Sequence, residues 1–149
     1  AVILTFGAPL SQDSVLHQPS LCESGTRHVV TALSRGGSGR LICMTSLGAG
    51  NSAHHGRFVF RNVIAPLLLG RILRDRTAQE EVVQKSGLQD WVIVRPTELV
   101  EGDAAPVRTI RNLDNESEPT TITRASVART LVDLISKQSF DGTAVTITN

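Results

Sequence analysis

Residues with hydrogen-bonding capacity stand directly after three short apolar runs of the chain. They are Gly7 and Ala8 after the first run, Thr45 and Ser46 after the second, and Pro96, Thr97 and Glu98 after the third. The hydroxyl groups can hydrogen-bond a carbonyl of a ligand, and the glycine and proline positions can present backbone groups. The alternative interpretation is that these residues cap strands and form ordinary turns. They are therefore candidates for a ligand-binding site.

Arg76 is a further candidate because a guanidinium group suits phosphate and ribose oxygens. Its alternative role is a surface ion pair with Glu80, one helical turn further on, worth roughly a few tenths of a kcal/mol. The sequence leaves both roles open.

The remaining reactive residue types favour structural roles. His54 and His55 are adjacent, and adjacent residues rarely bind one metal ion well; no Cys, Asp or Glu stands at a useful spacing. We therefore expect a solvated loop and no metal site. Cys22 and Cys43 cannot form a disulfide framework, and reduced buried thiols are typical of a cytoplasmic protein.

The elements that must position these residues follow from hydrophobic periodicity. Buried strands are predicted at 1–6, 40–45 and 91–95, with a possible short strand at 107–111 and a last strand at 144–148. A helix carries an apolar face of Cys22, Thr26, Val29, Val30 and Leu33 and ends at Gly36 and Gly37. A helical region spans about 57–85, interrupted near Pro66 and Gly70, with Ile72, Arg76 and Val83 on one face and Glu81 able to pair with Lys85. The last helix begins at the N-cap Thr123 and buries Val127, Leu131, Leu134 and Ile135.

This alternation of strands and helices predicts an α/β fold with a doubly wound parallel sheet. We expect one domain over residues 1–149. In such sheets ligands bind outside the carboxyl ends of the strands, where the candidate residues lie.

Composition excludes several function classes. The net charge is +1, aromatic residues make up 3% and tyrosine is absent, so a nucleic-acid partner is not expected. No apolar stretch approaches the roughly 20 residues needed to cross a membrane, so no membrane partner is expected either.

Four segments resemble one protein family. They are LICMTSLGA at 41–49, DRTAQEEVVQKSG at 75–87, WVIVRP at 91–96 and ITRASVA at 122–128. Together they resemble the atypical short-chain dehydrogenase/reductase group with an NAD(P)H-binding Rossmann domain, which includes flavin/biliverdin reductase B and the nitrogen-metabolite-repression type regulators. The resemblance covers essentially the whole chain.

The resemblance implies that residue 1 corresponds to the start of the family's fourth strand, so the Rossmann-like sheet is expected to be incomplete at its N-terminus. The Gly-x-Gly-x-x-Gly turn would then lie upstream. Gly36 to Gly39 stands between a helix and a strand, which is the wrong order for that turn, and Gly48 to Gly50 has no third glycine at the required spacing. The first strand would have an unpaired edge, which predicts self-association or a partner that supplies the missing part.

In catalytic short-chain dehydrogenases, a serine after the fifth strand and a Tyr-x-x-x-Lys pair on the next helix carry proton transfer. By resemblance Ser46 takes the serine position, but Ile72 and Arg76 take the places of the tyrosine and the lysine. Isoleucine has no proton to give, and arginine is a poor general acid or base. The tyrosine-dependent reaction is therefore not expected.

Hydride transfer to a conjugated acceptor can proceed with a solvent proton. The resemblance thus implies an NAD(P)H-dependent oxidoreductase for a flavin, a quinone or a similar small acceptor, with NADP slightly favoured over NAD. It places the cofactor at Gly7, Ala8, Thr45, Ser46, Arg76, Pro96, Thr97 and Glu98. The alternative is a non-catalytic NAD(P)-sensing regulator or partner-binding module. A nucleoside-sugar epimerase is a distant third, because such enzymes usually keep the tyrosine.

Overall fold

The computed structural model of the chain describes residues 1–7, 20–37, 39–53, 55, 70–114, 119–137 and 141–149. The helices are α2 (Leu21–Arg35), α3 (Gly70–Gln84) and α4 (Arg124–Ile135), with a short 3-10 helix η1 (Gly50–Ser52). The strands are β1 (Val2–Leu4), β2 (Leu41–Met44), β3 (Trp91–Pro96), β4 (Glu98–Val100), β5 (Arg108–Ile110), β6 (Thr121–Thr123) and β7 (Asp141–Thr148).

The main sheet has the strand order β1-β2-β3-β7-β5. Its first four strands are parallel, whereas β5 runs antiparallel to β7 at the edge. The predicted α/β fold with a doubly wound parallel sheet is confirmed, and the edge strand makes that sheet mixed. The parallel pair of β4 and β6 forms a second small sheet that the sequence analysis did not predict.

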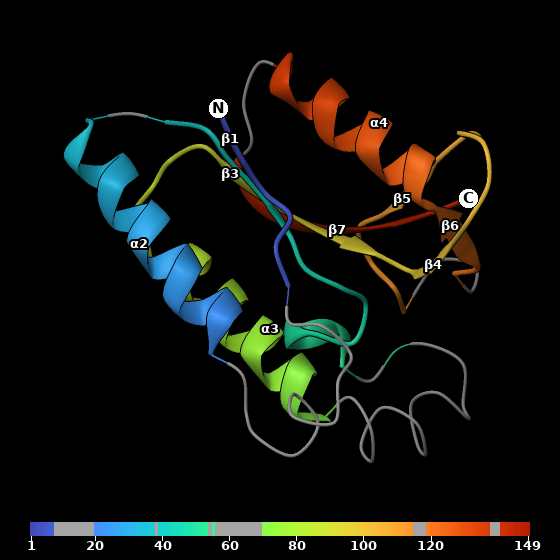
Figure 1. Ribbon diagram of the computed structural model, residues 1–149, viewed down its shortest axis with the longest axis horizontal. Coiled ribbons are helices and arrows are strands. Elements are labelled where there is room, and N and C mark those ends of the chain that lie inside the picture. The colour runs from blue at the N-terminus through green and yellow to red at the C-terminus, as the bar shows by residue number, and fades with distance from the viewer. Residues whose placement is uncertain (8–19, 38, 54, 56–69, 115–118, 138–140) are drawn as a thin grey trace.

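Helices cover both faces of the main sheet (Figure 1). The face under α2 and α3 buries a cluster formed by Leu4, Val30, Leu41, Cys43, Val83 and Ile93. The face under α4 buries a cluster formed by Ile42, Val92, Val94, Ile122, Val127, Leu131, Leu134, Val145 and Ile147. Successive residues of β2 and β3 therefore alternate between two apolar clusters, which explains why these strands read as continuous apolar runs.

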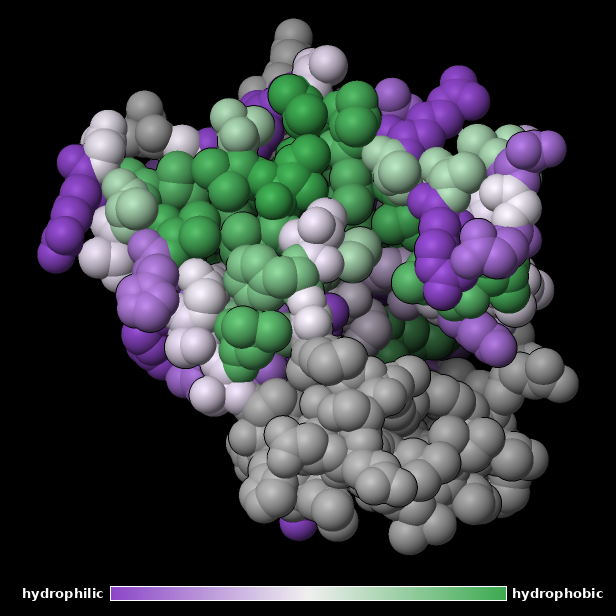
Figure 2. Space-filling view, in the orientation of Figure 1, coloured by the Kyte–Doolittle hydropathy of each residue, from purple (hydrophilic) through white to green (hydrophobic). Residues whose placement is uncertain are grey.

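β1 is less buried than the sequence analysis predicted. Only Leu4 is buried, whereas Val2 and Ile3 are half-buried. The reason is its position: among the described residues β2 is the one strand that pairs with β1. Figure 2 shows hydrophobic side chains gathered on the face of the molecule where β1 lies in Figure 1.

The predicted C-terminal end of α2 and the predicted N-cap of α4 are confirmed. Gly36 caps α2, and Gly37 adopts a positive φ of 79° that suits glycine. The Thr123 hydroxyl accepts a hydrogen bond from the Ser126 N–H at 3.1 Å and so begins α4. The expected burial of Ile135 is wrong, because this side chain is 43% exposed. Leu131 and Leu134 already fill the inward face, and the next residue is turned about 100° away from it.

The described part of the predicted 57–85 helical region is α3, and residues 56–69 lie outside the description. The predicted pair of Glu81 and Lys85 forms at 2.9 Å. Unlike a typical amphipathic helix, α3 buries three polar residues, Asp75, Gln79 and Glu80, beside Val83. Among the described residues, no helix is long and apolar enough to cross a membrane.

Candidate functional site

The carboxyl ends of β1, β2 and β3 lie side by side, because the three strands are parallel neighbours. Backbone hydrogen bonds continue past the strands: the Leu47 N–H donates to the Pro96 carbonyl at 3.0 Å, and the Thr97 N–H donates to the Ile147 carbonyl at 3.2 Å. The segments with Gly7, Ser46 and Thr97 therefore meet at one edge of the sheet. Ala8 lies outside the described residues.

The Thr45 side chain points away from this edge into the protein. It is buried, and its hydroxyl donates a 2.7 Å hydrogen bond to the Glu80 carboxylate. Arg95, in β3, donates to the same carboxylate through Nε at 2.9 Å and Nη2 at 2.6 Å. Thr45 thus joins a buried network that fixes the ends of β2 and β3 to α3.

The Glu80–Arg95 pair leaves no space beside Gly50, the first residue of η1. A Cβ atom at Gly50 would overlap the Glu80 carboxylate, and the φ of Gly50 is +55°. The Gly50 N–H also donates to the Thr77 hydroxyl at 3.0 Å. The segment after Ser46 is therefore held against α3 by contacts that require a glycine at this position.

Arg76 reaches the carboxyl ends of two strands from α3. Its Nη1 donates to the Met44 carbonyl at 3.1 Å and to Gln79 Oε1 at 2.9 Å. Its Nη2 lies so close to Gly7 that a Cβ atom there would overlap it. The alternative ion pair of Arg76 with Glu80 does not form, because Glu80 pairs with Arg95.

The other candidates differ in burial. Pro96 is buried as the last residue of β3, Glu98 is exposed at the start of β4, and Ser46 is half-buried in the turn after β2. Thr97 is 6% exposed, and its hydroxyl has no hydrogen-bond partner in the part of the chain that the structure describes. A buried hydroxyl without a partner is unfavourable by about 1–3 kcal/mol, so a ligand that hydrogen-bonds it would gain affinity. Ile72 is half-buried in the first turn of α3 and carries no ionisable group.

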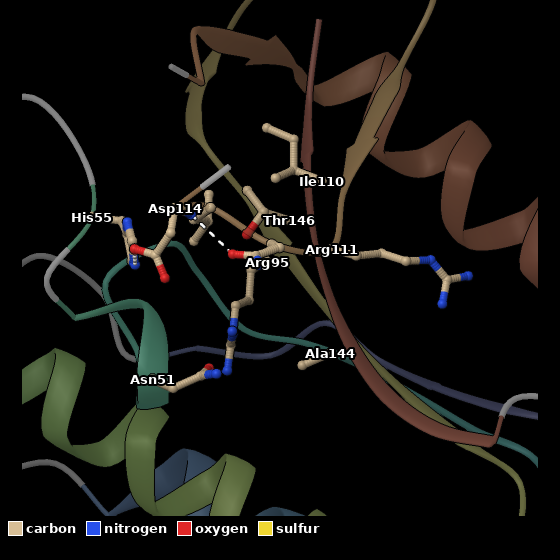
Figure 3. Close-up of a pocket in the computed structure, with 10 residues that line it drawn as sticks. Asn51, His55, Arg95, Ile110, Arg111, Asp114, Ala144 and Thr146 are labelled. Carbon is tan, nitrogen blue, oxygen red and sulfur yellow. Dashed lines mark hydrogen bonds and ion pairs between the residues drawn. The ribbon is translucent and has the colours of Figure 1, made fainter. Parts of the chain in front are cut away.

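A polar cavity of about 100 Å³ is lined by residues of η1, β3, β5 and β7 and of the segment after β5. Its lining includes Asn51, His55, Arg95, Asp114 and Thr146 (Figure 3). Figure 3 shows Arg95 extending toward Asn51, while His55 and Asp114 face each other. His55 Nε2 and Asp114 Oδ1 are 3.5 Å apart.

Arg95 and Glu80, which pair at this edge of the sheet, were not predicted as site residues. A usable signal existed for Arg95, because a charged residue inside an apolar strand must find a partner when buried. Glu80 gave no such signal, because a glutamate in a helix is usually solvated. Among the described residues, no group of three or more His, Cys, Asp or Glu side chains could hold a metal ion.

A doubly wound sheet with polar groups at the carboxyl ends of its parallel strands defines a Rossmann-like protein. Residues 1–138 match the model of the NAD(P)H-binding family, and the chain belongs to this family. The predicted resemblance to the atypical short-chain dehydrogenase/reductase group is confirmed. No match was found among curated proteins.

Solved structures with the same fold include two ChuY proteins of Escherichia coli. ChuY of strain O157:H7, an anaerobilin reductase, is 26% identical over 98% of this chain and 62% of its own, with a TM-score of 0.76. ChuY of strain CFT073 is 28% identical over 85% of this chain and 60% of its own, with a TM-score of 0.71. This chain therefore spans less than two thirds of the length of either protein.

A short-chain dehydrogenase/reductase from Veillonella parvula, solved in complex with NADP, shares the fold at 18% identity and a TM-score of 0.72. It is covered over 60% of its length, and 88% of this chain is aligned. At this identity the likeness concerns the fold alone.

Proposed function

We propose that this chain provides the nicotinamide-binding edge of an NAD(P)H-dependent oxidoreductase. The observation that carries the proposal is the unsatisfied polar capacity at the carboxyl ends of β1, β2 and β3. There Arg76 is half-buried with no ion-pair partner among the described residues, and the buried Thr97 hydroxyl has no hydrogen-bond partner. A ligand with oxyanions and amide groups, such as a nicotinamide dinucleotide, matches both needs.

The candidate residues would have different roles in binding the nicotinamide cofactor. Gly7 lets Arg76 approach the end of β1, and Arg76 would contact ribose or phosphate oxygens. The Ser46 and Thr97 hydroxyls would hydrogen-bond the carboxamide or the acceptor carbonyl, while Pro96 and Glu98 shape the neighbouring segment. Thr45 would not contact the ligand through its hydroxyl, because that hydroxyl donates its hydrogen bond to Glu80. It would instead hold the end of β2 in place. Ala8 remains a candidate next to Gly7.

The bound cofactor would supply the hydride. The chain would contribute orientation and exclusion of water rather than a strong acid, because Ile72 and Arg76 cannot replace a tyrosine as proton donor. The proton would come from solvent. We therefore propose a conjugated acceptor such as a flavin or a quinone. The anaerobilin reductase activity named for ChuY adds anaerobilin to the compounds to test.

The test is oxidation of NADPH and NADH by the full chain with flavin mononucleotide, a soluble quinone and anaerobilin, followed by the absorbance of the reduced nicotinamide. We expect turnover with at least one acceptor and a preference for NADPH. The Thr97→Val variant should raise the KM for NADPH several-fold, because it removes the unpaired hydroxyl while it keeps the shape. The Thr109→Val variant makes the same change at an exposed residue of β5 and should leave KM unchanged.

A second function is favoured by Ile72, since the position of the proton donor holds an aliphatic side chain. A non-catalytic NAD(P)-sensing module would bind the cofactor and give no turnover with any acceptor. Cofactor binding without turnover would therefore reject the oxidoreductase and support the sensor. We place the protein in the cytoplasm, a proposal supported by the burial of Cys22 and Cys43 as thiols.

A further inference from the structure

Arg76 carries a positive charge that no described carboxylate neutralises, although two acidic residues of α3 are close to it in sequence. Asp75 is used elsewhere: its carboxylate accepts hydrogen bonds from the Cys22 and Glu23 N–H groups, both at 3.0 Å. Glu80 is held by Arg95 and Thr45. Both carboxylates are buried and engaged, so neither can move to pair with Arg76.

The third neighbour, Gln79, holds Arg76 without neutralising it. Gln79 is fully buried, and its Oε1 accepts a 2.9 Å hydrogen bond from Arg76 Nη1. Its Nε2 donates to the Thr26 hydroxyl at 3.1 Å. These two bonds fix the orientation of the amide, because only its oxygen can accept from a guanidinium. A glutamate of the same shape would form an ion pair with Arg76 and neutralise the positive charge of its guanidinium.

The guanidinium is also held at a defined place. Nη1 is bonded to the Met44 carbonyl at the end of β2, and the group lies against Gly7 at the end of β1. Nε and Nη2 have no hydrogen-bond partner among the described residues. A planar fork with free N–H groups matches two oxygens of one oxyanion.

We propose that the free edge of Arg76 is an oxyanion subsite, and that Gln79 is the residue that keeps its charge available. The ligand chemistry is a phosphate-type oxyanion. That this oxyanion belongs to the nicotinamide cofactor rests on the proposed function; free phosphate is the other source with the same chemistry. Gln79 touches no ligand and is a positioning residue.

The test uses the full chain, with NADPH and inorganic phosphate as separate ligands. Binding of both ligands is measured by calorimetry for every chain. In the chains that keep Arg76, binding is also followed by the NMR signal of the Arg76 Nε–H, which is assigned with the Arg76→Met variant. We expect both ligands to shift the signal of the unmodified chain. Gln79→Glu should weaken both by about tenfold or more, because the new carboxylate competes with the oxyanion.

Gln84→Glu is the matched control, because it makes the same amide-to-carboxylate change on an exposed position of α3. It should leave both affinities within about twofold. Arg76→Met should weaken binding as much as Gln79→Glu does. Since Arg76 is half-buried, this second variant keeps the test valid if Gln79→Glu fails to fold.

The outcomes separate the subsite from the proposed function. Loss of phosphate binding in the variants, with no NADPH binding by any chain, would support the subsite and reject the cofactor as its source. If Gln79→Glu and Arg76→Met bind NADPH with unchanged affinity, the proposed subsite is overturned, whereas the proposed oxidoreductase function is not. Failure of both ligands to shift the Arg76 signal of the unmodified chain would also overturn it.

Discussion

At the scale of single residues, burial sets the chemistry of Cys43. Cys43 belongs to β2 and its side chain is fully buried. Desolvation raises the pKa of the thiol from 9.0 to about 12, and the weaker effect of the positive charge of Arg76 lowers this pKa. In the unfolded chain the thiol ionises first, so the unfolded state binds fewer protons at alkaline pH. The free energy of unfolding should therefore fall as pH rises from about 9 toward 12, by up to about 1.4 kcal/mol per pH unit.

The measurement is urea denaturation at about pH 8 and about pH 10, compared with the Cys43→Ala variant. The variant loses packing at both pH values, but its stability should fall less steeply with pH. An equal fall in both proteins would show that Cys43 is not the group responsible.

Gly50 offers a second test at this scale, because two effects at one residue can be separated. Gly50→Ala should destabilise the protein by about 1–2 kcal/mol for its positive φ, and further for the overlap with Glu80. Gly37→Ala is the control: its φ is +79°, and an added Cβ would meet nothing within 4 Å. If both variants lose the same stability in denaturation experiments, the Glu80–Arg95 pair does not constrain η1.

At the scale of elements, α3 connects the parts of the site through its polar buried face. Asp75 supplies the N-terminal cap of α2 from another helix, whereas Ser20, at the N-cap position, makes no side-chain cap bond. Asp75→Ala should lower the free energy of unfolding by roughly 1–3 kcal/mol, because the buried N–H of Cys22 and the half-buried N–H of Glu23 lose their acceptor.

Ser20→Ala is the matched comparison, and we expect a change below about 0.5 kcal/mol in the same urea titration. Sequence rules alone predict the reverse order, since serine at an N-cap usually stabilises a helix. A larger loss for Ser20→Ala than for Asp75→Ala would refute capping between helices.

At the scale of the whole molecule, β1 lies at an edge of the main sheet among the described residues, next to exposed hydrophobic surface (Figure 2). Edges of this kind pair with other chains. We therefore propose that the chain self-associates through β1 and expect a concentration-dependent increase in mass in sedimentation velocity.

Ile3→Lys should shift that equilibrium toward the monomer, because it places a charge on the half-buried edge strand. Val132→Lys makes a comparable change at an exposed position of α4 and should have no effect. A monomer at all concentrations, or equal effects of both variants, would contradict association through β1.

The sequence by itself determined the doubly wound fold, the C-terminal end of α2, the start of α4, and the strand ends at Gly7, Ser46 and Thr97. Apolar periodicity and capping are local, so they can be read from neighbouring residues. It did not determine the roles of the side chains of α3: the spacing of Arg76 and Glu80 left an ion pair between them open, but Glu80 pairs with Arg95. Which acid pairs with which base depends on burial and on contacts between distant segments, and those exist only in the tertiary structure.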